Sequence, residues 1–224
     1  MRLELQDIVI SIGDIELGGS LTVPEPAAGL VMFVHGSGSS RYHPRNRHLA
    51  ALLHDYHLAT LLFDLLTGGE KWIDAIDATP RFDVEMLAER VAGATDQLIA
   101  GGHAGDLPIG YLGDDLGTAA ALIAAASRPA QIAAVVSRGG RPDRAGSSLP
   151  SVRAPTLLIA GGADPWGLPA NQEAAARLSA PHRLSVIPGA GPLFDEPGAL
   201  DEVAHLAGSW FTDQFAVAQL KHAS

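Results

Sequence analysis

Apolar and polar residues are arranged in blocks along this sequence, with short apolar runs separated by longer amphipathic or polar stretches. Six of the runs are almost continuously apolar, which is the pattern of parallel strands buried on both faces. They occupy residues 30–34, 59–64, 109–112, 132–136, 156–160 and 184–187. Helices are predicted between and after them, over residues 45–53, 84–100, 118–126 and 200–220.

The amino-terminal segment has a different pattern, because apolar and charged residues alternate in it. Residues 3–12 and 15–23 are predicted to form two strands, and Gly13 and Asp14 between them are typical of a hairpin turn. Residues 68–81 are polar and contain glycines, so a loop with some helix is expected there.

The alternation of strands and helices predicts an α/β fold, with a mostly parallel sheet covered by helices on both faces. No linker, repeat or low-complexity segment divides the 224 residues, so we expect a single domain over residues 1–224. In such sheets ligands bind beyond the carboxyl ends of the strands. The segments that directly follow strands are therefore the candidate sites.

The segment after the strand at 109–112 carries the strongest signal. Gly113 and Gly117 lie four residues apart between that strand and an alanine-rich helix. A strand, a tight Gly-x-x-x-Gly turn and a helix form the nucleophile elbow of α/β-hydrolases, where the small glycines let the strand and the helix pass close together. The middle residue, which is normally the attacking serine, is Asp115 here.

Composition excludes several classes of protein. The formal net charge of -10, with no basic cluster to offset it, disfavours nucleic-acid binding. No apolar run approaches the length of a membrane span, and the first residues resemble a strand more than a signal peptide. The chain has no cysteine, which excludes disulfide and thiol chemistry and is consistent with a cytoplasmic protein.

The loop after residues 30–34 begins with His35, Gly36 and Ser37. In an α/β-hydrolase this loop supplies one backbone N–H of the oxyanion hole, here that of Ser37, and the residue after the nucleophile, here Leu116, supplies the other. An ordinary turn and a phosphate-binding nest are alternatives. A P-loop is excluded, because no Gly-Lys-Ser/Thr sequence ends the segment.

Two further loops are expected to complete a catalytic triad. Asp164 follows the strand at 156–160, in the place of the acid that orients a catalytic histidine, although an Asx turn would also explain it. The histidine should follow the last strand, but no histidine occurs there. Arg138 is a candidate for the rim of the site, where it could bind an anionic group, although loop arginines are more often solvated or paired with nearby acids. Trp166 could line a pocket, although aromatic residues beside proline and glycine are as often loop anchors.

These segments together resemble the small dienelactone-hydrolase-like α/β-hydrolases, some of whose members are labelled phosphoribosyltransferase-like because they are fused to such a domain. The resemblance covers nearly the whole chain, and the stretches that carry it are residues 34–41, 44–47, 61–67, 81–83, 109–111, 137–143 and 154–159. It implies that Asp115 stands in place of the serine and Pro192 in place of the histidine. Of the three triad positions, the resemblance implies that only the acid is unchanged, as Asp164.

Three roles for Asp115 follow. It could be a general acid or base, which needs neither a covalent intermediate nor a histidine. It could be a nucleophile that forms an ester, although the second step then lacks an obvious base. Asp115 or Asp114 could instead cap the following helix, in a descendant that binds a ligand without catalysis.

We favour the first role. The expected protein is an atypical α/β-hydrolase-fold enzyme whose Asp115 moves a proton on a small, largely apolar substrate, by isomerisation, cyclisation, elimination or lactone opening. Asp164 is assigned to the catalytic group. Substrate binding is assigned to His35, Gly36, Ser37, Leu116, Arg138 and Trp166. We expect no metal or organic cofactor, no nucleic-acid or membrane partner, and either a monomer or a homodimer.

Overall fold

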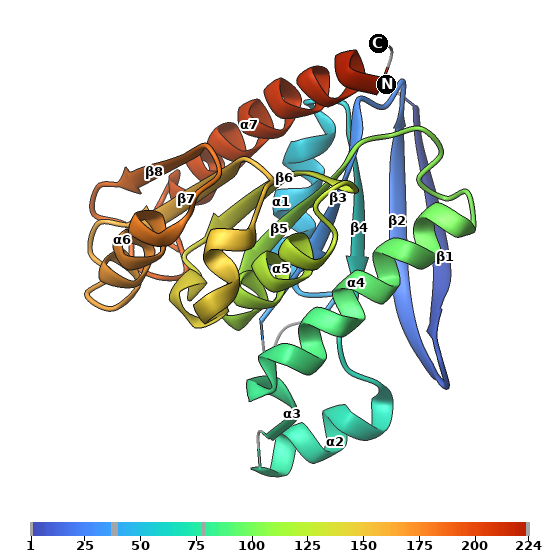
Figure 1. Cartoon of the computed structure of the whole chain (residues 1–224), viewed down its shortest axis with the longest axis horizontal. Helices are drawn as coiled ribbons and strands as arrows, with labels where there is room; N and C mark the ends of the chain where they lie inside the picture. The colour runs from blue at the N-terminus through green and yellow to red at the C-terminus, as the bar shows by residue number, and fades with distance from the viewer. Residues whose placement is uncertain (1, 37–39, 78, 223–224) are drawn as a thin grey trace.

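The computed structural model describes residues 2–36, 40–77 and 79–222, which form one eight-stranded sheet (Figure 1). The strand order is β1-β2-β4-β3-β5-β6-β7-β8. The strands are β1 (Arg2–Ile12), β2 (Ile15–Glu25), β3 (Gly29–Val34), β4 (Leu58–Phe63), β5 (Ile109–Asp114), β6 (Ile132–Arg138), β7 (Thr156–Gly161) and β8 (His182–Ile187).

The pairing of the strands confirms the predicted hairpin and the predicted parallel core. β1 and β2 are antiparallel and turn at Gly13, whose φ of 57° is in the left-handed region that favours glycine. β2 is also antiparallel to β4, and the strands from β4 to β8 are parallel to their neighbours. The six apolar runs of the sequence lie in these parallel strands, except for Asp64, the last residue of the second run, which follows β4.

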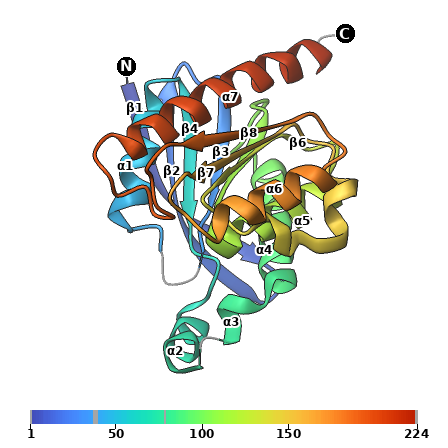
Figure 2. The ribbon, with the colours of Figure 1, turned by 90° about the vertical axis from the view of Figure 1, so that its left-hand side faces the viewer.

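Helices cover both faces of the sheet, as predicted. One face carries α1 (Pro44–His54) and α7 (Ala199–His222), and the other carries α4 (Val84–Ala100), α5 (Asp115–Ser127) and α6 (Gly167–Arg177) (Figures 1 and 2). This arrangement is the α/β-hydrolase fold. No helix among the described residues has the length and apolar character needed to cross a membrane.

Three helical segments were not defined by the sequence pattern. These are α6 and the 3₁₀ helix η1 (Pro142–Ser151), for which no element was predicted, and the pair α2 (Gly68–Asp77) and α3 (Thr79–Phe82), where a loop with some helix was predicted. α2 and α3 project from the body beyond the carboxyl ends of the parallel strands (Figures 1 and 2). They therefore lie where a ligand of this fold is expected.

The close packing of α7 on the sheet depends on two glycines. Phe211 and Phe215 are fully buried, and their rings lie 5.4 Å apart between centroids. A Cβ atom at Gly29 would overlap the Phe215 ring, and one at Gly110 would lie 2.6 Å from the Phe211 ring. The absence of side chains on β3 and β5 therefore makes room for both rings.

We expect Phe215→Ala to destabilise the fold by about 3–5 kcal/mol, because it leaves a cavity where the ring packs on Gly29. Val217→Ala is the matched control, since Val217 lies two residues further along α7 and is 46% exposed. Its effect should stay within about 0.5 kcal/mol. Urea unfolding of both variants measures the difference, and equal losses would contradict this account of the packing.

Candidate functional site

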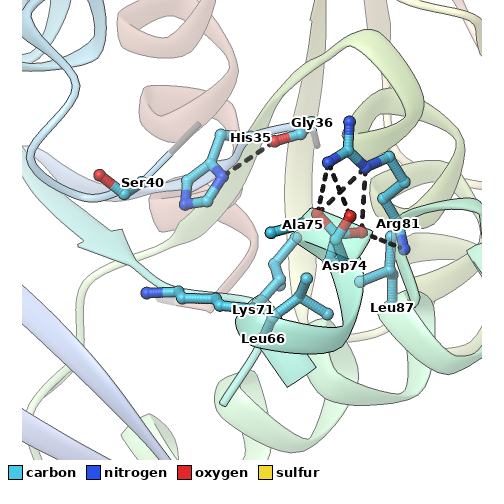
Figure 3. Close-up of a pocket in the computed structure, with 10 residues that line it drawn as sticks. His35, Gly36, Ser40, Leu66, Lys71, Asp74, Ala75, Arg81 and Leu87 are labelled. Carbon is cyan, nitrogen blue, oxygen red and sulfur yellow. Dashed lines mark hydrogen bonds and ion pairs between the residues drawn. The ribbon is translucent and has the colours of Figure 1, made fainter. Parts of the chain in front are cut away.

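A cavity of about 300 Å³ opens between the end of the sheet and the projecting helices (Figure 3). Its walls combine apolar side chains with a few polar groups, as is typical of small-molecule sites. The residues that line it are His35, Gly36, Ser40, Leu65, Leu66, Lys71, Asp74, Ala75, Arg81 and Leu87.

The nucleophile elbow has the backbone conformation that the sequence predicted. Asp115 has a φ of 47°, a strained conformation for a residue with a side chain and the hallmark of this turn. A Cβ atom at Gly117 would overlap the Val34 carbonyl oxygen, and one at Gly113 would overlap the backbone of Thr118. Both glycines are therefore required by the close passage of β3, β5 and α5.

Asp115 is exposed, and its side chain lies against Gly36, which lines the cavity, although Asp115 is not itself among the lining residues. A Cβ atom at Gly36 would be 2.7 Å from the Asp115 Oδ2 atom. Asp114 occupies the N-cap position of α5, but its side chain makes no capping hydrogen bond. The capping role that the sequence allowed for Asp114 is therefore wrong.

Asp114 instead belongs to a polar cluster under the elbow. Its Oδ1 accepts the Gly36 N–H at 2.5 Å, and its Oδ2 pairs with Nη2 of Arg138. The same Nη2 lies 3.0 Å from Oδ1 of Asn46. Arg138 is 5% exposed and is therefore a buried partner of Asp114. The prediction that Arg138 lies at the rim of the site was wrong.

The charge of Asp115 acts on two nearby arginines, Arg81 and Arg141. Arg81 donates hydrogen bonds to both carboxylate oxygens of Asp74. These bonds are the main reason why the pKa of the Arg81 guanidinium is raised, and the negative charge of Asp115 raises it further. Arg141 is held in the same way by Asp143, with a smaller contribution from Asp115. The Arg141 amide also donates to the Asp115 carbonyl at 3.0 Å. Asp115 thus lies near two arginines, each of which is already paired with another carboxylate.

Asp164 is buried and engages the start of α6. Its Oδ1 accepts the N–H groups of Trp166 at 3.1 Å and Gly167 at 2.8 Å. These are the contacts of an Asx turn, which was the alternative to a catalytic acid at this position. The Trp166 side chain is 81% exposed and is absent from the lining of the cavity.

The position that the resemblance assigns to the missing histidine is occupied by an exposed proline, Pro192. Its carbonyl oxygen approaches Gly139, which has a φ of 54°. Gly140, the next residue, packs on the Asp115 carbonyl. The loop after β8 therefore lies next to the segment that packs on the elbow, and the residue at the histidine position there is not ionisable.

The two predicted oxyanion amides have different outcomes. Ser37 lies outside the described residues. Leu116 is half-buried in the first turn of α5, where backbone N–H groups have no partner within the helix. Its amide therefore stays a candidate donor.

The wall of the cavity formed by α2 is anchored by one ion pair. Glu70 accepts hydrogen bonds from Arg90 at 2.5 and 2.7 Å and from the Thr67 amide at 2.8 Å. Arg90 also donates to the Leu65 carbonyl at 2.6 Å. The hydrogen bonds from Arg90 are the main cause that lowers the pKa of Glu70 to about 2.

The cavity thus gathers groups that the sequence pattern did not assign to the site, chiefly Lys71, Asp74 and Arg81. The weak pattern over residues 68–81 gave no basis for placing them, because it fixed neither helix. Among the described residues, no group of three or more His, Asp or Glu side chains is placed to hold a metal ion.

Comparisons with known proteins place the chain among hydrolases. It is similar to the crystal structure of a dienelactone hydrolase from Anabaena variabilis, with 49% identity, a TM-score of 0.93, and coverage of 95% of this chain and 99% of that one. The esterase Est1E from Butyrivibrio proteoclasticus is 15% identical with a TM-score of 0.76, covering 94% of this chain and 99% of that one, which shows the shared fold alone. No family model matches the chain.

Curated relatives from two strains of Mycobacterium tuberculosis are 48% identical over 208 residues, which is 93% of this chain. Their names describe them as phosphoribosyl transferases. The match includes 46% of their length, so the chain spans about half of these relatives.

We expect Arg138→Met to cost about 3–5 kcal/mol of stability, because it leaves the Asp114 carboxylate partly buried without its cation. The double variant Asp114→Ala/Arg138→Met removes both charges and should lose less than the single variant. Urea unfolding of both proteins measures this. A double variant as unstable as the sum of the single variants Asp114→Ala and Arg138→Met would contradict the coupling.

The Glu70–Arg90 pair should make stability depend on pH. Because the pKa of Glu70 is lowered to about 2 in the folded chain, its stabilising effect is complete above its ordinary pKa of 4.5 and is lost as pH falls toward 2. Glu70→Gln should therefore be less stable than the original chain at pH 6. The gap should narrow steadily below about pH 4.5, as measured by urea midpoints. A gap that stays constant down to pH 3 would show that the charge of Glu70 contributes nothing.

Proposed function

We propose that this chain, which belongs to the dienelactone hydrolase family of α/β-hydrolases, is an enzyme in which Asp115 moves a proton on a small, largely apolar substrate. The observation that carries the proposal is the position of the Asp115 side chain. Asp115 has a φ of 47°, is exposed, and its side chain lies against Gly36, a residue that lines the cavity.

The surroundings of Asp115 support a role in proton transfer. The elbow places its carboxylate at the start of α5, where the helix dipole and the unpaired amides favour negative charge. Arg81 and Arg141 lie within electrostatic reach. A carboxylate held in this way can take a proton from a substrate carbon or hydroxyl and return it to another atom, without a histidine.

The reactions that need only such a transfer are isomerisation, cyclisation, elimination and lactone opening. In a lactone opening, Asp115 would take a proton from water as the water oxygen attacks the carbonyl carbon. The C–O bond then breaks, and the proton passes to the leaving alkoxide. The Leu116 amide would stabilise the oxyanion that forms in between.

A second candidate is nucleophilic attack by Asp115, because the elbow position is that of the attacking residue in this fold. A carboxylate oxygen would then form an ester with the substrate carbon, as halide leaves a haloalkane or as the C–O bond of an epoxide opens and its oxygen takes a proton from water. Intact-mass measurement after exposure to epoxides and haloalkanes distinguishes the two candidates. An added mass that is lost in Asp115→Asn supports the nucleophile, and proton transfer leaves the mass unchanged.

Asp115→Asn should lower turnover by about 10² to 10⁴-fold with the fold intact, because the amide cannot accept a proton. The substrates to screen are small lactones, enol esters and ketones in D₂O, where NMR detects both new products and deuterium incorporation. Asp213→Asn is the control, since Asp213 is exposed on α7. Full activity of Asp115→Asn would refute both candidate roles of Asp115.

A further inference from the structure

The imidazole of His35 is a buried group of the cavity to which the proposed reaction gives no role. His35 follows β3 directly and is 5% exposed. Nδ1 lies 3.3 Å from the Gly36 carbonyl oxygen, which can only accept a hydrogen bond. Nδ1 therefore carries the proton, and in the neutral ring Nε2 is left with its lone pair as an acceptor.

Nε2 of His35 has no hydrogen-bonding partner among the residues that the structure describes. Figure 3 shows the ring with Nδ1 turned toward Gly36 and its other edge turned away. His35 lines the cavity, but its Nε2 atom is itself almost fully covered, so a bound molecule meets this edge only when the atoms that cover it move aside. Leaving a buried acceptor without a donor costs free energy, so a ligand that donates a hydrogen bond there is favoured.

The other polar groups of the cavity disfavour an anion. Lys71 Nζ lies 2.9 Å from Asp64 Oδ2, and Arg81 donates to both carboxylate oxygens of Asp74. Each cation of the lining is therefore already paired with a carboxylate. An anionic ligand would have to compete with these pairs and would lie close to the Asp115 charge.

The remaining walls and the size of the cavity favour a small apolar body. Leu65, Leu66, Ala75 and Leu87 supply the apolar surface. The cavity of about 300 Å³ is roughly twice the ~150 Å³ of an engineered protein cavity that binds benzene. One substituted ring, or a chain of similar size, therefore fits.

We propose that the cavity binds an uncharged, largely apolar molecule that carries a hydroxyl group, such as a phenol or an enol, and that this O–H donates to Nε2 of His35. The inference deepens the proposed function by naming a substrate class for the same cavity. It does not require Asp115 to be catalytic, because binding is measured without turnover.

The test uses phenol as the probe and compares it with toluene, which lacks the hydroxyl, and benzoate, which is an anion. Calorimetry or NMR titration of the whole chain should show phenol binding about tenfold more tightly than either, the effect of one buried hydrogen bond. Equal affinity for phenol and toluene, or a preference for benzoate, would overturn the proposal.

Two variants of His35 separate its two nitrogens. In His35→Asn the side-chain amide takes the place of Nδ1 and keeps the bond to Gly36, but the acceptor is gone, so phenol affinity should fall about tenfold. In His35→Gln the amide reaches the place of Nε2, and affinity for phenol should be largely kept. His205→Asn, in an exposed part of α7, is the control. Unchanged phenol binding by His35→Asn would refute the role of Nε2.

If His35→Asn does not fold, as judged by circular dichroism, ¹⁵N NMR of the histidine rings in the unaltered chain decides. The Nε2 resonance of His35 should be that of an unprotonated nitrogen and should move on adding phenol. A protonated Nε2, or no change with phenol, overturns the proposal. The same titration on Asp115→Asn separates the two proposals, because phenol should still bind even where the proposed turnover is absent.

Discussion

The site depends on the bridge that the Asp114 carboxylate makes between the Gly36 amide and the Arg138 guanidinium. These three residues follow or end β3, β5 and β6, which are neighbours in the centre of the sheet. The bridge fixes Gly36 against the side chain of Asp115. Because a carboxylate and a guanidinium are costly to bury separately, the three strand ends are held in one arrangement.

The bridge also explains which parts of the site the sequence predicted. The elbow was predictable, since strand, turn and helix are contiguous in the chain and Gly113 and Gly117 meet a local steric demand. Arg138 was assigned to the rim, because its partner Asp114 is 24 residues away and no local pattern joins them. Asp114 was considered only as a helix cap, for the same reason.

The elements of the fold divide in a similar way. Strands buried on both faces are continuous apolar runs, so the parallel core was predicted almost completely. α6 was not predicted from the sequence, because its residues are of mixed polarity. The helix begins at Gly167, whose N–H donates a hydrogen bond to the Asp164 carboxylate. Residues 68–81 fold as α2 and α3 through distant contacts, above all that of Glu70 with Arg90.

An aspartate at the elbow, where this fold normally carries a serine, changes what the elbow can hold. A serine hydroxyl is neutral and leaves the helix start free to stabilise an anion, whereas a carboxylate is itself an anion in that place. With Lys71 and Arg81 also paired to carboxylates, little positive charge in the cavity is left for the ligand. The proposed movement of protons on an uncharged molecule fits this balance of charge, and the proposed hydrogen bond to Nε2 of His35 would select molecules that carry a hydroxyl group.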